Sequence, residues 1–275
     1  MEIAELFRQA WDEVLDGLSG RFSLDLRSLD GPVASRDPDA SHYAASTIKL
    51  PVLMALLRDR IAQVPAALGG VVVHDRFPSA AGGTFELQQS DDQDDQTWSR
   101  LGIEVDLLDL ADRMITVSSN IATDLILERI GFESVRGWLA DHGLETHQHV
   151  TRLIGDVAAE YAGITNSVTA SGLATLMASI ASGTDPDSAT ALGMLARQTH
   201  RDMIPAGLPD GTWSASKGGW VAGVKHDVAF VRPVDAPPYV LAICTTADLP
   251  DAAGKELVAR LSAVTWEQWS RWHAS

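Results

Sequence analysis

The sequence predicts an α+β fold in which an antiparallel sheet, built from both ends of the chain and flanked by helices, carries an inserted all-helical lobe. Strand-like alternation of polar and apolar residues occurs near the start of the chain and again after residue 211. Helical periodicity dominates the segment between them, and a helical segment closes the chain. Strands and helices segregated in this way are typical of α+β proteins. With 275 residues, 45% of them hydrophobic, the chain is long enough to bury a substantial core.

The first sixty residues are expected to form a helix, a hairpin and a second helix. Apolar residues recur at helical spacing until Gly20, and the next segment alternates as a strand does. Asp30 and Gly31 form a typical hairpin turn. Pro51 lies about one turn into the second helix, where it should remove a hydrogen bond and bend the helix. The predicted ranges are 3–18 and 46–60 for the helices, and 22–27 and 32–36 for the strands.

The middle of the chain is predicted to be helical and its end to return to strands. Segment 78–100 has poor periodicity and contains an acidic run, Asp91 to Asp95. We expect this run to be a solvated loop, because it lacks the spacing of a dedicated calcium site. The predicted helices are 105–115, 121–130, 133–141 and 169–183, the predicted strands are 212–217, 224–231 and 239–246, and a closing helix contains Leu257 and Trp272.

These elements predict two lobes. Residues 1–60 and 205–275 are expected to form an α/β lobe, and residues 61–204 a helical lobe. An active site is expected between the two lobes.

The charge balance restricts the partners of the protein. Its 21 basic and 37 acidic side chains give a net charge of −16, which repels nucleic-acid phosphates and anionic lipids. The apolar run from Leu50 to Leu57 is much shorter than the roughly 20 residues of a membrane-spanning helix. We therefore expect no nucleic-acid partner and no membrane span. We also expect a monomer or simple homo-oligomer that acts on a small molecule; the motifs described below imply that this molecule is an acyl substrate. The acidic residues after Met1 predict a cytoplasmic protein, and removal of a leader is the alternative that would make it secreted or periplasmic.

No set of residues is typical of a metal site. His147 and His149 could supply two imidazoles, but no third ligand follows at a useful spacing. Cys244 is the only cysteine and lies in an apolar segment, so we expect a buried thiol and no intrachain disulfide. We expect no metal and no other cofactor.

Ser46 and Lys49 form an S-x-x-K pattern at the start of the apolar helix 46–60. Residues three apart share one face of a helix, so the lysine amine can lie close to the serine hydroxyl. A serine needs a base to become a nucleophile, and a buried lysine with a lowered pKa can act as that base. The helix N-terminus adds free backbone N–H groups and a positive dipole end. A second match, from Ser214 to Lys217, lies in a strand-like segment, where this geometry is not expected.

Three segments in order carry a resemblance to a known family. After the S-x-x-K pattern come Ser118 to Asn120, between two predicted helices, and Lys217 to Gly219, on a predicted strand. In this order the sequence resembles the penicillin-recognising serine enzymes, specifically the class A β-lactamases, whose motifs are S-x-x-K, S-D-N and K-T-G. The resemblance extends from the first helix to the last and implies a β-lactamase/transpeptidase-like fold.

The resemblance implies a role for each motif residue. Ser46 would attack an acyl carbonyl and become acylated, with Lys49 as general base or proton relay. Ser118 would pass a proton to the leaving nitrogen and link Lys49 to Lys217, which would supply positive field for a substrate carboxylate. The implied substrate-binding residues are Asn120, which would hold an amide, Gly219 of the third motif, and Trp220, whose backbone N–H would complete an oxyanion hole with that of Ser46.

Three positions depart from the family pattern. Ser119 replaces the aspartate of S-D-N, which is structural in the family, and should change the chemistry little. Gly218 lacks the hydroxyl of K-T-G that helps to bind a substrate carboxylate, so ordinary penicillins should bind more weakly, or the true substrate lacks that carboxylate. The family's glutamate, which activates the deacylating water, would fall near Val157. Asp156 and Glu160 are the candidate replacements, and both could equally face solvent or cap a turn.

The resulting prediction is a serine hydrolase that forms an acyl-Ser46 intermediate and hydrolyses the amide of a β-lactam. One alternative is a hydrolase of a non-β-lactam ester, amide or lactone. Another is a penicillin-binding protein that is acylated but deacylates slowly. The third is a non-catalytic ligand-binding module, which would have no reason to retain the proton relay of Lys49 and Ser118.

Overall fold

The structure, a computed structural model, describes residues 3–274, and the chain divides into two compact units. One unit contains the chain up to Thr47 together with the chain from Val168 onward, and the other is Ile48–Ser167. The boundaries predicted after residues 60 and 204 therefore differ from the observed ones. Each of them falls inside a helix that lies within a single unit.

The first unit is built on a five-stranded antiparallel sheet that joins the two ends of the chain, as predicted. Strands β1 and β12 pair along their whole length, with Leu24 opposite Ile243. The sheet order is β10-β11-β12-β1-β2, so β10, which carries Lys217, is an edge strand. The strands are β1 (Arg21–Ser28), β2 (Gly31–Arg36), β10 (Trp213–Val221), β11 (Val224–Arg232) and β12 (Tyr239–Thr246).

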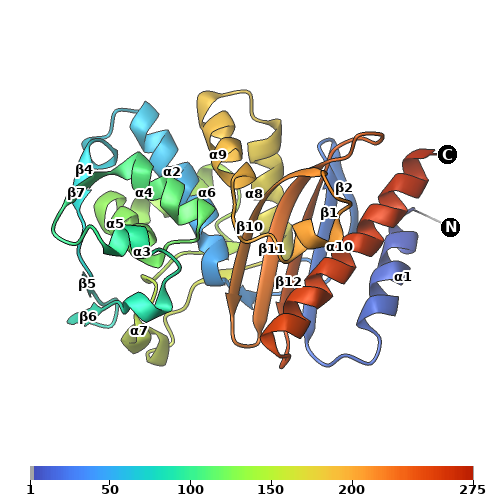
Figure 1. Cartoon of the computed structure of the whole chain (residues 1–275), viewed down its shortest axis with the longest axis horizontal. Coiled ribbons are helices and arrows are strands. Elements are labelled where there is room, and N and C mark those ends of the chain that lie inside the picture. Colours follow the sequence, from blue (N-terminus) through green and yellow to red (C-terminus); the bar gives the residue numbers. More distant parts are fainter. Residues whose placement is uncertain (1–2, 275) are drawn as a thin grey trace. The chain divides into compact units, whose positions relative to one another are not determined.

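Helices cover both faces of this sheet (Figure 1). Helices α1 and α10 pack against each other on one face, where the Trp11 indole donates to Thr265 Oγ1 at 2.8 Å. Helix α8 packs on the other face, and α9 contacts α8 and the edge strand β10. Helices α8 and α9 therefore belong with the sheet and not with the helical lobe in which the sequence placed them. The ranges are α1 (Ile3–Leu15), α8 (Ala170–Ser182), α9 (Pro186–Ala196), α10 (Asp251–Ala274) and the short η4 (Ile204–Gly207).

The second unit is mainly helical and surrounds α2. Helix α2 has no wide polar face: Leu53 and Leu56 are fully buried, and so is Lys49 at its first position. It packs against α4, α5 and α6. The helices are α2 (Lys49–Ile61), α3 (Asp95–Trp98), α4 (Leu107–Thr116), α5 (Asn120–Ile130), α6 (Phe132–Asp141) and α7 (Val157–Tyr161), with short turns η2 (Pro65–Ala67) and η3 (Gln89–Asp91).

Small strands in this unit correct the expectation of an all-helical lobe. Strand β4 pairs with β7, and β5 pairs with β6. Each has only three residues, which is too short for period-two alternation to reveal. Their ranges are β4 (Gly70–Val72), β5 (Arg76–Pro78), β6 (Thr84–Glu86) and β7 (Glu104–Asp106). The described part of the chain also includes the two-residue strands β3 (His42–Tyr43), β8 (Gln148–His149) and β9 (Ser167–Val168).

The start of α2 differs from the predicted helix 46–60. The chain first forms a 3₁₀ turn, η1 (Ala45–Ile48), and the α-helix begins at Lys49. Pro51 therefore lies in the first helical turn, where backbone N–H groups have no intrahelical partner in any case. A backbone N–H at position 51 would have no partner within the helix, so Pro51 removes no helical hydrogen bond, contrary to expectation.

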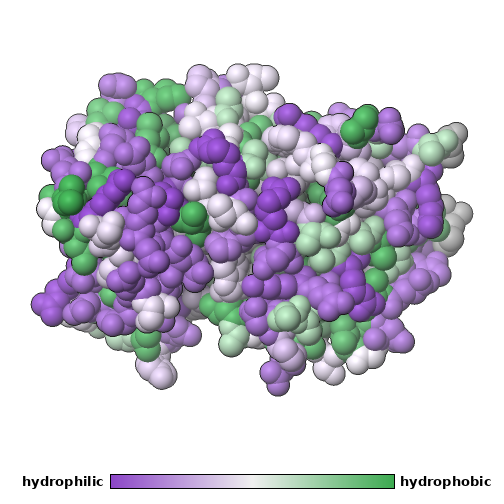
Figure 2. Space-filling model, in the orientation of Figure 1, coloured by the Kyte–Doolittle hydropathy of each residue, from purple (hydrophilic) through white to green (hydrophobic). Residues whose placement is uncertain are grey.

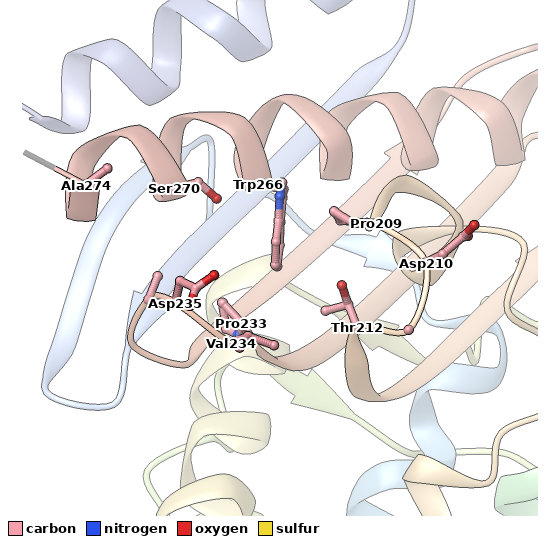
Figure 3. A pocket seen from close by; sticks show the side chains of 11 residues that line it. Pro209, Asp210, Thr212, Pro233, Val234, Asp235, Trp266, Ser270 and Ala274 are labelled. Atoms are coloured by element: carbon pink, nitrogen blue, oxygen red, sulfur yellow. The ribbon is translucent and has the colours of Figure 1, made fainter.

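Hydrophilic residues cover most of the face in Figure 2, in keeping with the net charge of −16. Within residues 3–274, no helix is both long and apolar enough to cross a membrane. A pocket of about 420 Å³ in the first unit lies between the end of α10 and the turns 209–212 and 233–236 (Figure 3). Its lining includes Trp266 and Ser270 but none of the residues predicted to be catalytic.

Candidate active site

The amine of Lys49 lies at the centre of a buried polar cluster in the second unit. Its Nζ donates to the backbone oxygen of Ser118 at 2.5 Å, to Ser118 Oγ at 3.1 Å and to Asn120 Oδ1 at 2.8 Å. Helix α2 supplies the lysine, and the turn between α4 and α5 supplies its partners. The first and second predicted motifs therefore meet at this amine.

Burial changes the acid-base behaviour of this amine. Loss of water around the side chain lowers the pKa of Lys49 to about 7, although the negative charges of Asp92 and Asp124 oppose the shift. An amine with a pKa near neutrality is partly deprotonated at neutral pH. It can then accept a proton, which an ordinary surface lysine cannot do.

The turn that presents Ser118 has an unusual backbone. Helix α4 ends at Thr116, and Ser118 has a φ of 63°, in the left-handed region that non-glycine residues rarely adopt. Ser119 then caps α5, because its Oγ accepts the backbone N–H of Ala122 at 3.2 Å. Ser119 therefore has a structural role, as the sequence suggested for this position.

The acidic run of residues 91–95 is not simply a solvated loop. Asp92 accepts the backbone N–H groups of Asn120 and Ile121, each at 2.8 Å, and so holds the N-terminus of α5. Asp94 is buried and pairs with Arg113. Asp91, Gln93 and Asp95 are exposed. Local sequence patterns do not reveal these contacts, because they join residues 19 to 29 positions apart.

Asp124 is a second functional candidate that sequence reasoning did not single out. It lies one turn after Asn120 on α5 and is fully buried. Its Oδ1 accepts the backbone N–H of Ile154 at 2.9 Å, and its Oδ2 has no hydrogen-bond partner among the described residues. Burial raises the pKa of Asp124 well above its usual range, against the attraction of Lys49. A buried carboxyl group is therefore coupled electrostatically to the Lys49 amine.

Asp156 and Glu160, the predicted deacylation candidates, make bonds within their own region. Asp156 caps α7 through the N–H of Ala159 at 3.1 Å and accepts from Ser79 Oγ at 2.8 Å. Glu160 pairs with Arg152 at 3.0 Å, and its side chain is 61% exposed. These contacts match the capping and solvent-facing alternative that the sequence left open.

The first unit carries Ser46 and the third motif. Ser46 lies in η1, and Gly219 of β10 approaches its backbone closely. A Cβ atom at Gly219 would lie 2.8 Å from Ser46 N and 2.9 Å from Thr47 N, so this position requires glycine. Trp220 follows directly on β10, with its ring 4.8 Å from that of His200.

Lys217 is fully buried on β10, and its Nζ donates to the backbone oxygen of Gly218 at 2.6 Å. The second S-x-x-K match, Ser214 to Lys217, lies within this strand, as predicted. Ser214 Oγ accepts from Arg201 at 2.8 Å. The proton path from Lys49 through Ser118 to Lys217 involves residues of both units and stays a prediction.

Two buried histidines fix the segment that leads to Ser46. His226, opposite Gly219 on β11, donates from Nε2 to Tyr43 O at 2.8 Å and accepts the N–H of Thr245 at Nδ1 at 3.1 Å. The ring of His42 lies edge-on at 5.3 Å. Burial lowers the pKa of His226 to about 4 and that of His42 to about 3, so both rings are neutral at neutral pH.

Residues 3–274 contain no group of three histidine, cysteine, aspartate or glutamate side chains that could hold a metal ion. The polar groups around Lys49 are instead suited to proton transfer. A lysine amine, a serine hydroxyl and an amide oxygen within hydrogen-bond distance can exchange or orient a proton at the start of α2.

Comparison with known sequences identifies one family and one curated relative. The model of the family described as "Beta-lactamase enzyme family" matches residues 6–269. A beta-lactamase from Bacillus amyloliquefaciens is 28% identical over 165 residues, which cover 57% of this chain and 53% of that protein. The match thus spans about half the length of the curated relative.

Solved structures of similar fold cover nearly the whole chain. The structure of PBP-A has 25% identity and a TM-score of 0.77, covering 97% of this chain and 96% of that one. A beta-lactamase from Sphaerobacter thermophilus has 21% identity and a TM-score of 0.78, covering 97% and 98%. The class A beta-lactamase from Mycobacterium abscessus has 18% identity and a TM-score of 0.78, covering 96% and 99%. At 21% and 18% identity, the last two structures show that this chain shares their fold.

The histidine pair predicts a loss of stability in acid. As pH falls from about 6.5 to 4, unfolded His226 takes up a proton and the folded residue does not, so unfolding becomes more favourable by about 1.4 kcal/mol per pH unit. We expect the stability advantage of the wild type over His226→Asn to shrink across this window in urea titrations. A difference that stays constant with pH would contradict the assignment.

Proposed function

The chain belongs to the beta-lactamase enzyme family, a family of serine hydrolases, and from this premise we propose that it opens β-lactam rings through an acyl-Ser46 intermediate. The observation that carries the proposal is the fully buried Lys49 amine with a pKa near 7, three residues after Ser46 in a continuous helical segment. Its hydrogen bonds to Ser118 and Asn120 hold it ready for proton transfer.

In the proposed acylation, Lys49 accepts the proton of Ser46 while Oγ attacks the carbonyl carbon. The backbone N–H groups of Ser46 and Trp220 stabilise the oxyanion. The C–N bond then breaks, and Ser118 delivers a proton to the leaving nitrogen, with its own proton replaced from the protonated Lys49. Lys49 thereby returns to its neutral form, and the acyl group is bound to Ser46 as an ester.

For the release step, we favour slow hydrolysis of the acyl-enzyme over rapid turnover. Water must be activated by a base to attack the ester. Asp156 and Glu160 are engaged with Ser79 and Arg152, and burial favours the protonated form of Asp124. An acyl-enzyme complex with penicillin G is described for a leucine-to-glutamate variant of PBP-A, 25% identical over 97% of each chain with a TM-score of 0.76. That variant suggests an experiment for this chain, in which a glutamate is introduced and its effect on release of the acyl group is measured.

The direct test is intact-protein mass spectrometry after incubation with a chromogenic cephalosporin or a penicillin. We expect the mass of the wild-type chain to increase by the mass of the drug. This adduct should last much longer than the acyl-enzyme of a fast hydrolase. Ser46→Ala should form none. An absence of both adduct and hydrolysis, or an adduct that survives Ser46→Ala, would refute the proposal.

Lys49→Arg should slow acylation by about a hundredfold to ten-thousandfold, because a guanidinium keeps hydrogen-bond donors but does not release its proton. In the wild type, the acylation rate should rise with pH through about 7, as Lys49 loses its proton. Stopped-flow measurement of the acylation rate from pH 5.5 to 9 checks both statements. A pH-independent rate, or a fully active arginine variant, would exclude Lys49 as the base.

Val157→Glu should speed release of the acyl group by at least about tenfold, because it adds a carboxylate at the position where the resemblance to class A β-lactamases places the water-activating glutamate. Tyr161→Glu, on the same short helix but at an 89% exposed position, adds the same charge as a control. Decay of the adduct mass measures both rates. Equal decay in the two variants would show that residue 157 does not face the acyl-enzyme.

A further inference from the structure

The pocket at the end of α10 is lined by acidic groups and an aromatic ring, and none of its lining residues is basic. Its volume of about 420 Å³ lies within the usual range of small-molecule sites. Asp210 and Asp235 are its charged lining residues, both are exposed, and neither forms an ion pair with another described residue. In a chain with a net charge of −16, such a pocket favours a cation over an anion.

Trp266 supplies the aromatic surface of this pocket. Figure 3 shows its indole projecting from α10 into the space between the turns 209–212 and 233–236. The side chain is half-buried and packs against the hydrophobic core of the first unit. The core therefore holds the ring in place, and part of its surface remains open to the pocket.

Two other tryptophans of the first unit already have a cation over the ring. The guanidinium carbon of Arg232 lies 4.3 Å from the centre of the Trp213 ring, and Lys255 Nζ lies 5.6 Å from the centre of the Trp220 ring. Both distances are within the range of cation–π attraction. No cation of the described residues lies over Trp266 in this way. Its ring is therefore available to a cation from outside the chain.

We propose that this pocket binds a small organic cation, a substituted ammonium with an apolar body, whose charge lies against Trp266 between Asp210 and Asp235. Methyl or methylene groups on the nitrogen would bury apolar surface against the ring while the charge is kept. A metal ion fits less well, because residues 3–274 contain no group of three suitable ligands. The pocket lies within the first unit and does not include Ser46, so this site is independent of the proposed acylation.

The test uses choline as the probe and, as its uncharged analogue, the alcohol in which a tert-butyl group replaces the trimethylammonium group. Each compound gives one strong methyl signal, whose NMR relaxation reports binding to the full chain. Shifts of the eight tryptophan indole N–H signals locate the site, with the spectrum of Trp266→Leu as reference. We expect choline to shift the Trp266 signal saturably and to bind at least about fivefold more tightly than the alcohol. Equal binding of the two compounds, or no saturable shift, would overturn the proposal.

A charge variant tests the role of the two acids. Asp210→Asn combined with Asp235→Asn should weaken choline binding by about three- to tenfold and leave the alcohol within about twofold, because only the cation is attracted by carboxylates. Both side chains are exposed, so the fold should tolerate the changes. Asp30→Asn, at an exposed hairpin turn of the same unit, is the control and should change neither affinity. Equal weakening of both ligands, or of neither, would contradict the role of the acids.

A second variant pair tests the ring. Trp266→Leu keeps an apolar wall and removes the π face, so the preference for choline over the alcohol should fall to about twofold or less. Trp213→Leu should keep the full preference, because the Trp213 ring is already covered by Arg232. The ratio of the two affinities is the measure, since a folding defect would lower both. A preference that survives Trp266→Leu, or falls equally in both variants, would show that Trp266 does not bind the cation.

Discussion

The burial of one lysine amine is the constraint on which the site depends. An ammonium group without water is costly, and the protein meets this cost with three acceptor atoms from Ser118 and Asn120 and with a lowered pKa. The apolar helix α2 enforces the burial, because Lys49 is its first residue and the helix has neighbours on several sides. Exposure of this amine would return its pKa towards 10.5 and remove the base.

Three carboxyl groups, two of them buried and one half-buried, connect separate elements of this acidic chain. Asp92 holds the N-terminus of α5, Asp124 joins that helix to the loop at Ile154, and Asp227 joins β11 to the start of η4 at Ile204. Each carboxylate binds a backbone N–H, which fixes a turn as well as a charge. The same three groups bear on the electrostatics of Lys49 and Lys217.

Local patterns in the sequence predicted the sheet built from both chain ends, the order of the motifs and most of the longer helices, but not α9 (Pro186–Ala196) or the short α3 and α7. The contact of Lys49 with Ser118 and Asn120 was expected only from the resemblance, because a local pattern does not show that residues about seventy positions apart in the sequence lie together. The roles of Asp92 and Asp124 were not predicted, since a carboxylate that bonds to a distant helix looks like any other acidic residue in a loop. Helix α8 was placed in the wrong lobe because its amphipathic pattern shows that it packs but not against which partner.

The most direct test of the account is the pKa of the Lys49 amine. The chain has four lysines, so the Cε atoms that carry their amines give few enough signals to assign by carbon-detected NMR. A spectrum of Lys49→Arg identifies the signal of Lys49. The account predicts that the Lys49 signal titrates near pH 7. A midpoint above pH 9.5 would contradict it, because the amine would then stay protonated where the enzyme must work.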